Sequence, residues 1–148
     1  MTVISFAGEP TTDIKIITEL MSMAKRTRAI LRLRLADLGL ATGEDDILLG
    51  IPSEGNCSVE DLSRTLSVRA PTIERSIDSL VGRGYVERLA GPIVKLSTSG
   101  TATATRIGHM QAEIVRDLRA ELGKGFVEDV ATDLATLNGG LAKLLSSV

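Results

Sequence analysis

Cations and hydroxyl groups follow one another at helical spacing in the middle of the chain, in a pattern suited to nucleic-acid contact. Guanidinium groups bind guanine edges and phosphate oxygens, and hydroxyl groups bind phosphates or base edges. The residues that we expect to make such contacts are Arg69, Thr72, Arg75, Ser76, Ser79, Arg64 and Arg83. On a helix over 71–84, such side chains could meet a DNA major groove, and Arg64 and Arg83 could bind the phosphate backbone beside it.

Ordinary solvated charges are the alternative interpretation of the same arginines. Exposed charged residues are the default on helix surfaces, and Arg75 and Arg83 have Glu74, Asp78 and Glu87 close by in sequence. Residues 44–97 hold six basic and nine acidic side chains, a net charge of −3, which is the wrong sign for binding phosphate. Several of these acids stand at predicted helix N-termini, where negative charge is favourable. The sequence leaves both interpretations open.

Other chemistry is poorly supported. His109 is the only histidine and Cys57 the only cysteine, so a histidine metal site, a catalytic dyad or a disulfide cannot form within one chain. We expect Cys57 to lie in a loop, and an oxidant sensor there would need a lowered thiol pKa, which nearby Arg64 alone does not predict. Acidic residues 44–46 fit a helix start better than a metal site. No phosphate-binding glycine loop or nucleophile elbow is present, so we predict no enzyme, cofactor or metal.

Composition indicates a small helical protein. The chain has 148 residues, of which 43% are apolar and only 2% aromatic, and a net charge of −2. This length suits a single domain over 1–148, with a core of Leu, Ile, Val and Ala that favours helix packing over a sheet sandwich. No apolar run is long enough to cross a membrane, and Met1–Pro10 lacks the features of an export signal. We therefore expect a cytoplasmic protein.

The first half of the chain predicts three elements, of which the first is a long helix. Apolar residues recur at three- and four-residue steps over 13–38, which indicates a helix with one buried face, and Gly39 should end it. Thr42 should cap a second helix that stops before Pro52. Ser58 followed by Asp61 resembles a capping box for a third helix through Leu66.

The second half predicts the helix over 71–84, a hairpin and two more helices. Pro71 fits the first position of its helix, whose inward residues are Ile73, Ile77, Leu80 and Val81. Two β segments over 85–89 and 93–97 are joined by the tight loop Ala90–Pro92. Thr98 or a neighbouring hydroxyl should then open a helix that breaks at Gly123–Gly125 before a final helix.

The end helices carry apolar stripes that the central module, residues 40–97, is too small to cover. A second copy of the chain is the simplest partner, so we predict that 13–38 and 98–146 are dimerisation helices. Packing of these helices on each other within a monomer is the alternative.

This order of elements resembles the MarR family of transcription regulators, and so do the residues. The matching positions of the first stretch are Ile47, Leu48, Ile51, Ser58, Leu62, Leu66 and Val68. Those of the second are Thr72, Ile73, Arg75, Asp78, Leu80 and 84–88, followed by 94–100. The resemblance implies a mainly α winged helix-turn-helix fold, in which the hairpin is the wing, flanked by long dimerisation helices.

The resemblance further implies a homodimer that binds double-stranded DNA and represses genes by reading a palindromic operator through helix 71–84. A small-molecule effector, bound in a cleft that Met21, Ala24, Leu48 and Met110 would line, is a further implied partner; we interpret those four residues as core. Family wings are longer and carry an Asp-x-Arg element whose arginine enters the minor groove. The loop Ala90–Pro92 has no charged residue, so we predict that the wing contact is absent. The alternative function is a MarR-like dimer that has lost strong DNA binding and regulates through a protein partner or a ligand.

Overall fold

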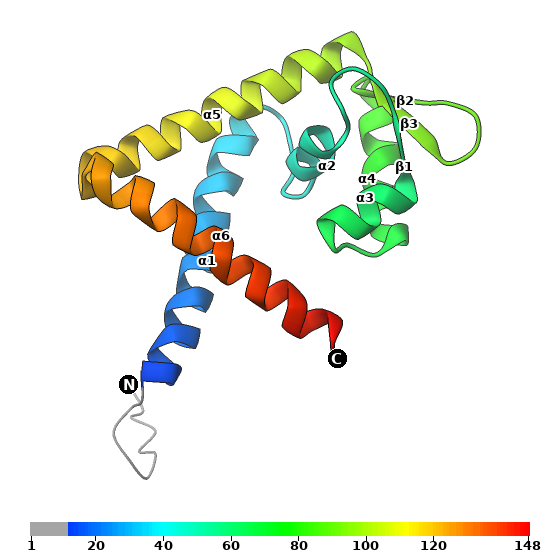
Figure 1. Ribbon diagram of the computed structural model, residues 1–148. Helices are drawn as coiled ribbons and strands as arrows, with labels where there is room; N and C mark the ends of the chain where they lie inside the picture. The colour runs from blue at the N-terminus through cyan, green and yellow to red at the C-terminus, as the bar shows by residue number, and fades with distance from the viewer. Residues whose placement is uncertain (1–11) are drawn as a thin grey trace, which may run out of the picture. The chain divides into compact units, whose positions relative to one another are not determined.

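The computed structural model describes residues 12–148 as six helices and a small antiparallel sheet (Figure 1). The irregular start and missing export signal predicted for Met1–Pro10 lie outside the described residues. The chain divides into two compact units, Met1–Ala104 and Thr105–Val148. The predicted single-domain organisation, the module bounds 40–97 and the role of the end helices stay predictions.

Helix α1 (Thr12–Asp37) has nearly the predicted bounds. Gly39 ends it with φ +71°, and the amides of Leu40 and Gly39 donate to the carbonyls of Leu35 and Ala36, which is the Schellman arrangement. Most of the predicted apolar face is exposed within one chain, since Ile17 and Met21 are more than half exposed, so its burial against a second copy stays a prediction. Leu35, near the C-terminal end, is fully buried.

Helices α2 (Glu44–Gly50), α3 (Val59–Leu66) and α4 (Ala70–Gly82) pack on one another around the core of the first unit. Side chains that are at most 2% exposed fill this core: Ile47, Leu48, Ile51, Leu62, Ile73, Ile77 and Leu80. Ser58 caps α3 as predicted, accepting from the amide of Asp61 at 3.0 Å. The predicted Thr42 cap of α2 is wrong: Gly43 is the N-cap, and the carboxylates of Glu44 and Asp45 accept the amides of Ala41 and Gly43 instead.

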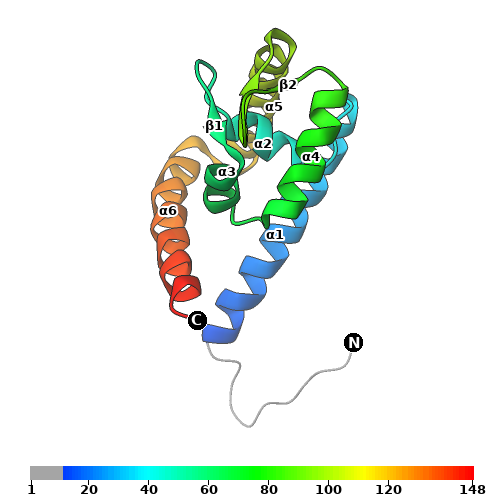
Figure 2. The same cartoon turned by 90° about the vertical axis from the view of Figure 1, so that its right-hand side faces the viewer.

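Helix α4 starts one residue earlier and ends two residues earlier than predicted. Ala70 precedes Pro71, which therefore occupies the second helical position. Gly84, at φ +81°, ends the helix, because its amide and that of Tyr85 turn back to the carbonyls of Val81 and Leu80. Figure 2 shows α3 and α4 as neighbours joined by a short turn, with the chain leaving the end of α4 for the sheet.

The sheet has three strands in the order β1-β3-β2, one more than predicted. Strands β2 (Val86–Arg88) and β3 (Ile93–Leu96) form the predicted hairpin, with Val86 opposite Leu96. Strand β1 (Cys57–Ser58) pairs with the other edge of β3, so the prediction of a loop at Cys57 is wrong. A two-residue strand is too short to show an alternating pattern in the sequence.

Helices α5 (Thr98–Leu122) and α6 (Lys124–Ser146) complete the chain. The hydroxyl of Ser97 accepts from the amide of Gly100, so a neighbour of Thr98 opens α5, as predicted. Gly123, at φ +90°, makes the predicted break, but Gly125 lies inside α6. No residue of α6 is buried within the chain. Over residues 12–148, none of the helices combines the length and the apolar character needed to cross a membrane.

Candidate nucleic-acid interface

The outward face of α4 holds the polar residues that the sequence predicted for it. Thr72, Arg75 and Ser79 are exposed and Ser76 is half-buried, whereas Ile73 and Ile77 point into the core. Positions 72, 75, 76 and 79 follow the three- and four-residue steps that place side chains on one face of a helix. The structure therefore brings four of the seven predicted residues together.

Two arginines stand exposed near the N-terminal end of α4. They are Arg69, the N-cap residue of the helix, and Arg75, about one and a half turns further on. Within residues 12–148, neither guanidinium group has a hydrogen bond or ion pair. The alternative in which Arg75 pairs with Glu74 or Asp78 is therefore not what the structure contains. Unpaired cations beside the positive end of a helix dipole favour an anion.

The acidic residues of α4 are neutralised by the sheet. Arg88 of β2 donates to Glu74 at 2.9 Å and to Asp78 at 2.5 Å. The hydrogen bonds from Arg88 to Asp78 and Glu74 raise the pKa of this guanidinium further above its ordinary value. The two carboxylates that would otherwise repel phosphate beside Arg75 are thus held by a cation.

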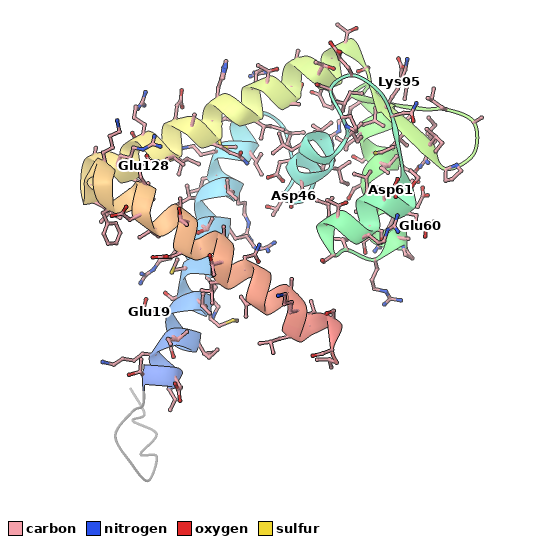
Figure 3. All side chains as sticks on the ribbon, viewed as in Figure 1. Glu19, Asp46, Glu60, Asp61, Lys95 and Glu128 are labelled. Atoms are coloured by element: carbon pink, nitrogen blue, oxygen red, sulfur yellow. The ribbon has the colours of Figure 1, made fainter. Side chains whose placement is uncertain are left out.

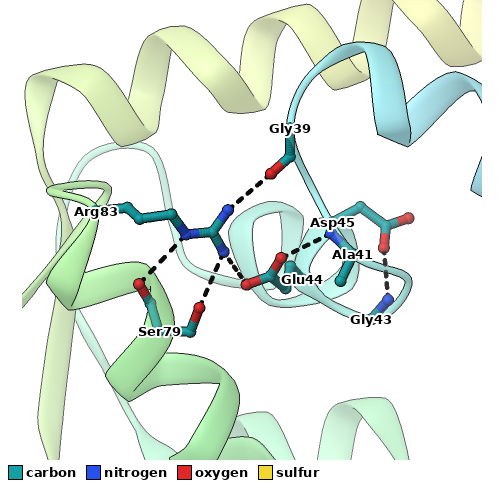
Figure 4. Close-up of polar contacts among 7 residues, drawn as sticks. All are labelled: Gly39, Ala41, Gly43, Glu44, Asp45, Ser79 and Arg83. Atoms are coloured by element: carbon teal, nitrogen blue, oxygen red, sulfur yellow. Dashed lines mark hydrogen bonds and ion pairs between the residues drawn. The ribbon is translucent and has the colours of Figure 1, made fainter.

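Arg83 is engaged on several sides, as Figure 4 shows. Its guanidinium group donates to the carbonyl of Gly39 at 2.8 Å, to the hydroxyl of Ser79 at 3.1 Å and to the carboxylate of Glu44, and it lies 5.7 Å from the ring centroid of Tyr85. The Arg83 side chain is 35% exposed and that of Glu44 only 8%. Arg83 therefore joins the end of α4 to the loop that precedes α2.

Arg64 lies on the exposed side of α3. It pairs with Asp61, three residues earlier, and its side chain is 71% exposed. Figure 3 shows Asp61 beside Glu60 at the start of α3. Hydrogen bonds from Ser58 and Arg64 lower the pKa of Asp61 below its ordinary value. A surface pair of this kind contributes little to stability, so Arg64 can exchange Asp61 for a phosphate at small cost.

The wing ends in an uncharged tip. The amide of Leu89 donates to the carbonyl of Ile93 at 2.8 Å, which leaves Ala90–Pro92 as the loop between the strands. Lys95 of β3 pairs with Glu87 of β2 at 3.3 Å. The two cations of the wing, Arg88 and Lys95, are therefore paired with acidic residues of the chain. The tip of the wing has no cation that could bind a phosphate.

An open groove of about 380 Å³ lies between α1 and the start of α2. It is lined by Leu20, Met23, Ala24, Thr27, Arg28, Leu31, Thr42, Asp45 and Asp46. Burial and the neighbouring Asp45 raise the pKa of Asp46, against the opposing effect of Arg28. Of the four residues named for an effector cleft, Leu48 and Met110 are core, Ala24 lines this groove, and Met21 is 58% exposed. Within one chain, the core interpretation is therefore wrong for Met21 and Ala24, both of which are exposed.

Neither thiolate nor metal chemistry gains support from the described residues. Burial and the nearby Asp61 raise the pKa of the Cys57 thiol, which is opposite to what a reactive cysteine requires. Among residues 12–148, no three His, Cys, Asp or Glu side chains lie together as metal ligands.

Two residues that shape this surface were missed at the level of sequence. Arg88 was noted only as part of the family pattern, and its contacts with Glu74 and Asp78 depend on how β2 lies against α4. Glu44 resembled a helix-start charge, yet its side chain is buried against Arg83, 39 positions away. A run of three acids gives no sign that two of them, Glu44 and Asp45, are buried.

Comparison with known proteins identifies the family. The sequence model described as the MarR family matches residues 44–92. The multiple antibiotic resistance protein MarR of Escherichia coli is 31% identical over 117 residues, which cover 75% of this chain and 77% of that protein.

Solved structures agree with this match. A mutant of the E. coli protein in complex with operator DNA has a TM-score of 0.66 at 28% identity, covering 93% of this chain and 99% of that one. A MarR family protein of Mycobacterium tuberculosis, in complex with DNA, has a TM-score of 0.73 at 22% identity over 81% of this chain and 94% of that one, a likeness of fold. The central winged helix-turn-helix, the mainly helical architecture and these matches agree: the chain belongs to the MarR family, whose members are transcriptional regulators and not enzymes.

Proposed function

We propose that the protein is a dimeric, sequence-specific DNA-binding repressor that reads a palindromic operator through the outward face of α4. The observation that carries the proposal is the pair of exposed arginines, Arg69 and Arg75, which have no ionic partner among residues 12–148 and belong to a helix whose own acids are held by Arg88. Local charge at this face is therefore positive although the module as a whole is acidic. Relatives solved with DNA support the same assignment. A regulator of this kind acts on the chromosome, so we infer a cytoplasmic location.

The seven predicted residues divide into three roles under this proposal. Arg75, with Thr72 and Ser76, reads base edges, since arginine is the commonest specific partner of guanine. Arg69 and Arg64 neutralise phosphates, which fixes the orientation of α4 without reading sequence. Ser79 and Arg83 already bond to each other, and we give them a supporting role.

Titration of the protein against its own upstream DNA at several salt concentrations tests the proposal. Each phosphate contact contributes about 0.9 to the slope of log K against log salt, so Arg69→Ala in both protomers should flatten the slope by roughly 1.8. Arg75→Ala should instead weaken operator binding by about 1–3 kcal/mol and relax the base preference, because it removes a base contact. Arg116→Ala removes an exposed side chain of α5. It is the matched control and should change neither the salt slope nor the affinity for the operator.

A second function is favoured by the uncharged wing tip, Ala90–Pro92, and by the acidic balance of residues 44–97. In this alternative, the dimer regulates by binding a protein partner or a small molecule, for which the groove between α1 and α2 is the candidate site. Binding to the upstream DNA at low salt distinguishes the two functions. A wild-type protein that is folded and dimeric but does not shift its upstream DNA even there would contradict DNA reading and favour the alternative.

A further inference from the structure

We propose that Arg83 and Glu44 form a latch that fixes the C-terminal end of α4 to the corner between α1 and α2, and that Arg83 serves DNA binding as a positioning residue. For its effect on DNA, the inference rests on the proposed function. It assigns Arg83 a role different from the phosphate contact that its place beside the predicted recognition helix suggests.

The contacts of Arg83 tie three separate parts of the chain together. Its guanidinium group donates to Gly39, the glycine that ends α1, and to Glu44, the first residue of α2. It also donates to the hydroxyl of Ser79 at 3.1 Å and to the carbonyl of the same residue at 3.4 Å. Two of its nitrogens donate to Gly39 and Glu44, and two further hydrogen bonds go to Ser79 of its own helix. These contacts fix the orientation of the planar guanidinium group. Few donors remain for a phosphate.

Glu44 is held as firmly on its side. One carboxylate oxygen accepts the amide of Ala41 at 2.7 Å and the other accepts from Arg83. The side chain is 8% exposed, and a buried carboxylate without its cation is strongly destabilising. The corner residues 39–44 and the end of α4 therefore keep one arrangement relative to each other.

The latch lies at the C-terminal end of α4, so a small tilt there displaces Thr72 and Arg75, which lie toward the other end. Helix α4 has 13 residues and is therefore roughly 20 Å long at about 1.5 Å per residue. A tilt of about 5° at its C-terminal end moves the other end by roughly 1.7 Å over that length. Thr72 and Arg75 lie toward that far end, and base readout depends on bidentate geometry. Loss of the latch should thus weaken specific binding without removing any phosphate contact.

The test uses the full-length protein and the variants E44Q, R83A and E44Q/R83A, with E60Q as matched control. Glu60 stands in the first turn of α3 as Glu44 does in α2, but it is exposed. We expect E44Q and R83A each to bind operator about tenfold more weakly, or about 1.4 kcal/mol, the double variant no more weakly than R83A, and all with the wild-type salt slope. If Arg83 instead binds phosphate, R83A flattens the slope by about 0.9 for each phosphate that the arginine neutralises, and E44Q binds at least as well as wild type. That result would overturn the positioning role.

A readout without DNA separates this inference from the proposed function. Tyr85 is the only tyrosine and there is no tryptophan, so ultraviolet-excited emission reports the ring that Arg83 faces. E44Q leaves Tyr85 and Arg83 in place, and we expect it to alter this emission and to speed hydrogen exchange at the amides of Gly84 and Tyr85, whereas E60Q does neither. Unchanged emission and exchange in E44Q, with cooperative unfolding retained, would overturn the latch whatever the DNA result. Altered emission with no DNA binding by wild type would support the latch and contradict the proposed function.

Discussion

Aliphatic side chains have opposite environments in the central module and in the last helix. Leu48, Ile77 and Leu80 are fully buried among α2, α3 and α4, whereas Leu141 and Leu144 of α6 are 43% and 67% exposed. Both regions show a regular apolar stripe in sequence. The central module therefore forms a complete hydrophobic core within one chain. The apolar stripe of α6, in contrast, is not covered by any described part of the same chain, residues 12–148.

The exposed stripes of α1 and α6 support the proposal that a second copy of the chain covers them. Large apolar patches on a monomer mark interaction sites, and small oligomers are most often twofold symmetric. Such a dimer would hold two α4 helices at a fixed spacing, which a palindrome requires.

The largest effect is expected in the module core. Ile77→Ala removes a fully buried side chain and should lower the free energy of unfolding by about 2–5 kcal/mol, at any protein concentration. Chemical denaturation followed by circular dichroism measures this. Leu141→Ala, the comparator, should cost less at low concentration, where the protein is monomeric and α6 stays exposed. Equal losses for both variants at all concentrations would contradict the contrast.

Dimerisation should respond to a charge on α6. Leu141→Asp places a carboxylate in the exposed apolar stripe and should raise the dimer dissociation constant by about 100-fold, or about 2.7 kcal/mol, because an unpaired charge must be desolvated. Sedimentation velocity over a range of concentrations measures the shift. Asp129→Ala, on the same helix, serves as control. A dimer unaffected by Leu141→Asp would place the interface elsewhere.

A smaller effect, with the opposite sign, is expected in the turn between α3 and α4. Ser67 is the only residue other than glycine with positive φ in the described part of the chain, at 53°. That conformation costs a non-glycine residue about 1–2 kcal/mol. Ser67→Gly should therefore raise the melting temperature, with a net gain of up to about 1 kcal/mol after the entropy that glycine adds to the unfolded chain. A lower melting temperature would mean that the Ser67 side chain contributes a contact of its own.

The smallest effects are expected from two aspartates whose pKa values shift in opposite directions from 3.8. The pKa of Asp61 is lowered, so its stabilising contribution is present above pH 3.8 and is lost as the pH falls through its folded value. The pKa of Asp46 is raised, so stability is lost as the pH rises through its folded value. At neutral pH, Asp61→Asn should destabilise slightly and Asp46→Asn should stabilise slightly, and both differences should become smaller in acid, that of Asp46 first. Melting temperatures at pH 7 and pH 3 check both signs.

Much of the fold could be predicted because local signals set the element ends. Gly39 and Gly84 end their helices in left-handed conformations, and Ser58 caps the third helix, as their types suggested. The predicted cap at Thr42 was wrong because Gly43, with φ +98°, takes the N-cap position, and the carboxylates of Glu44 and Asp45 bind the amides of Ala41 and Gly43 just before the helix. Strand β1 was missed because its pairing with β3 joins residues far apart in sequence.

The candidate site was predictable only where helical periodicity decides the outcome. Spacing alone placed Thr72 and Arg75 on the outward face of α4. It could not show that Arg83 bonds to Glu44, or that Arg88 holds Glu74 and Asp78, since these pairs depend on how separate elements pack. The apolar stripe of α1 likewise indicated a face to be covered but not which surface covers it.

Strand β3 is the central strand of the sheet, so the length of the hairpin tip can change without moving α4. Strand β3 is bonded along both edges, and the carbonyl of Pro92 accepts the amide of Val59 at 3.0 Å. Because loop closure becomes only slowly less favourable with length, extra residues between Ala90 and Gly91 should leave the sheet in register. Under the proposed function, a basic insertion there would extend the DNA contact into the flanking minor groove, so affinity and base preference could change separately in this scaffold.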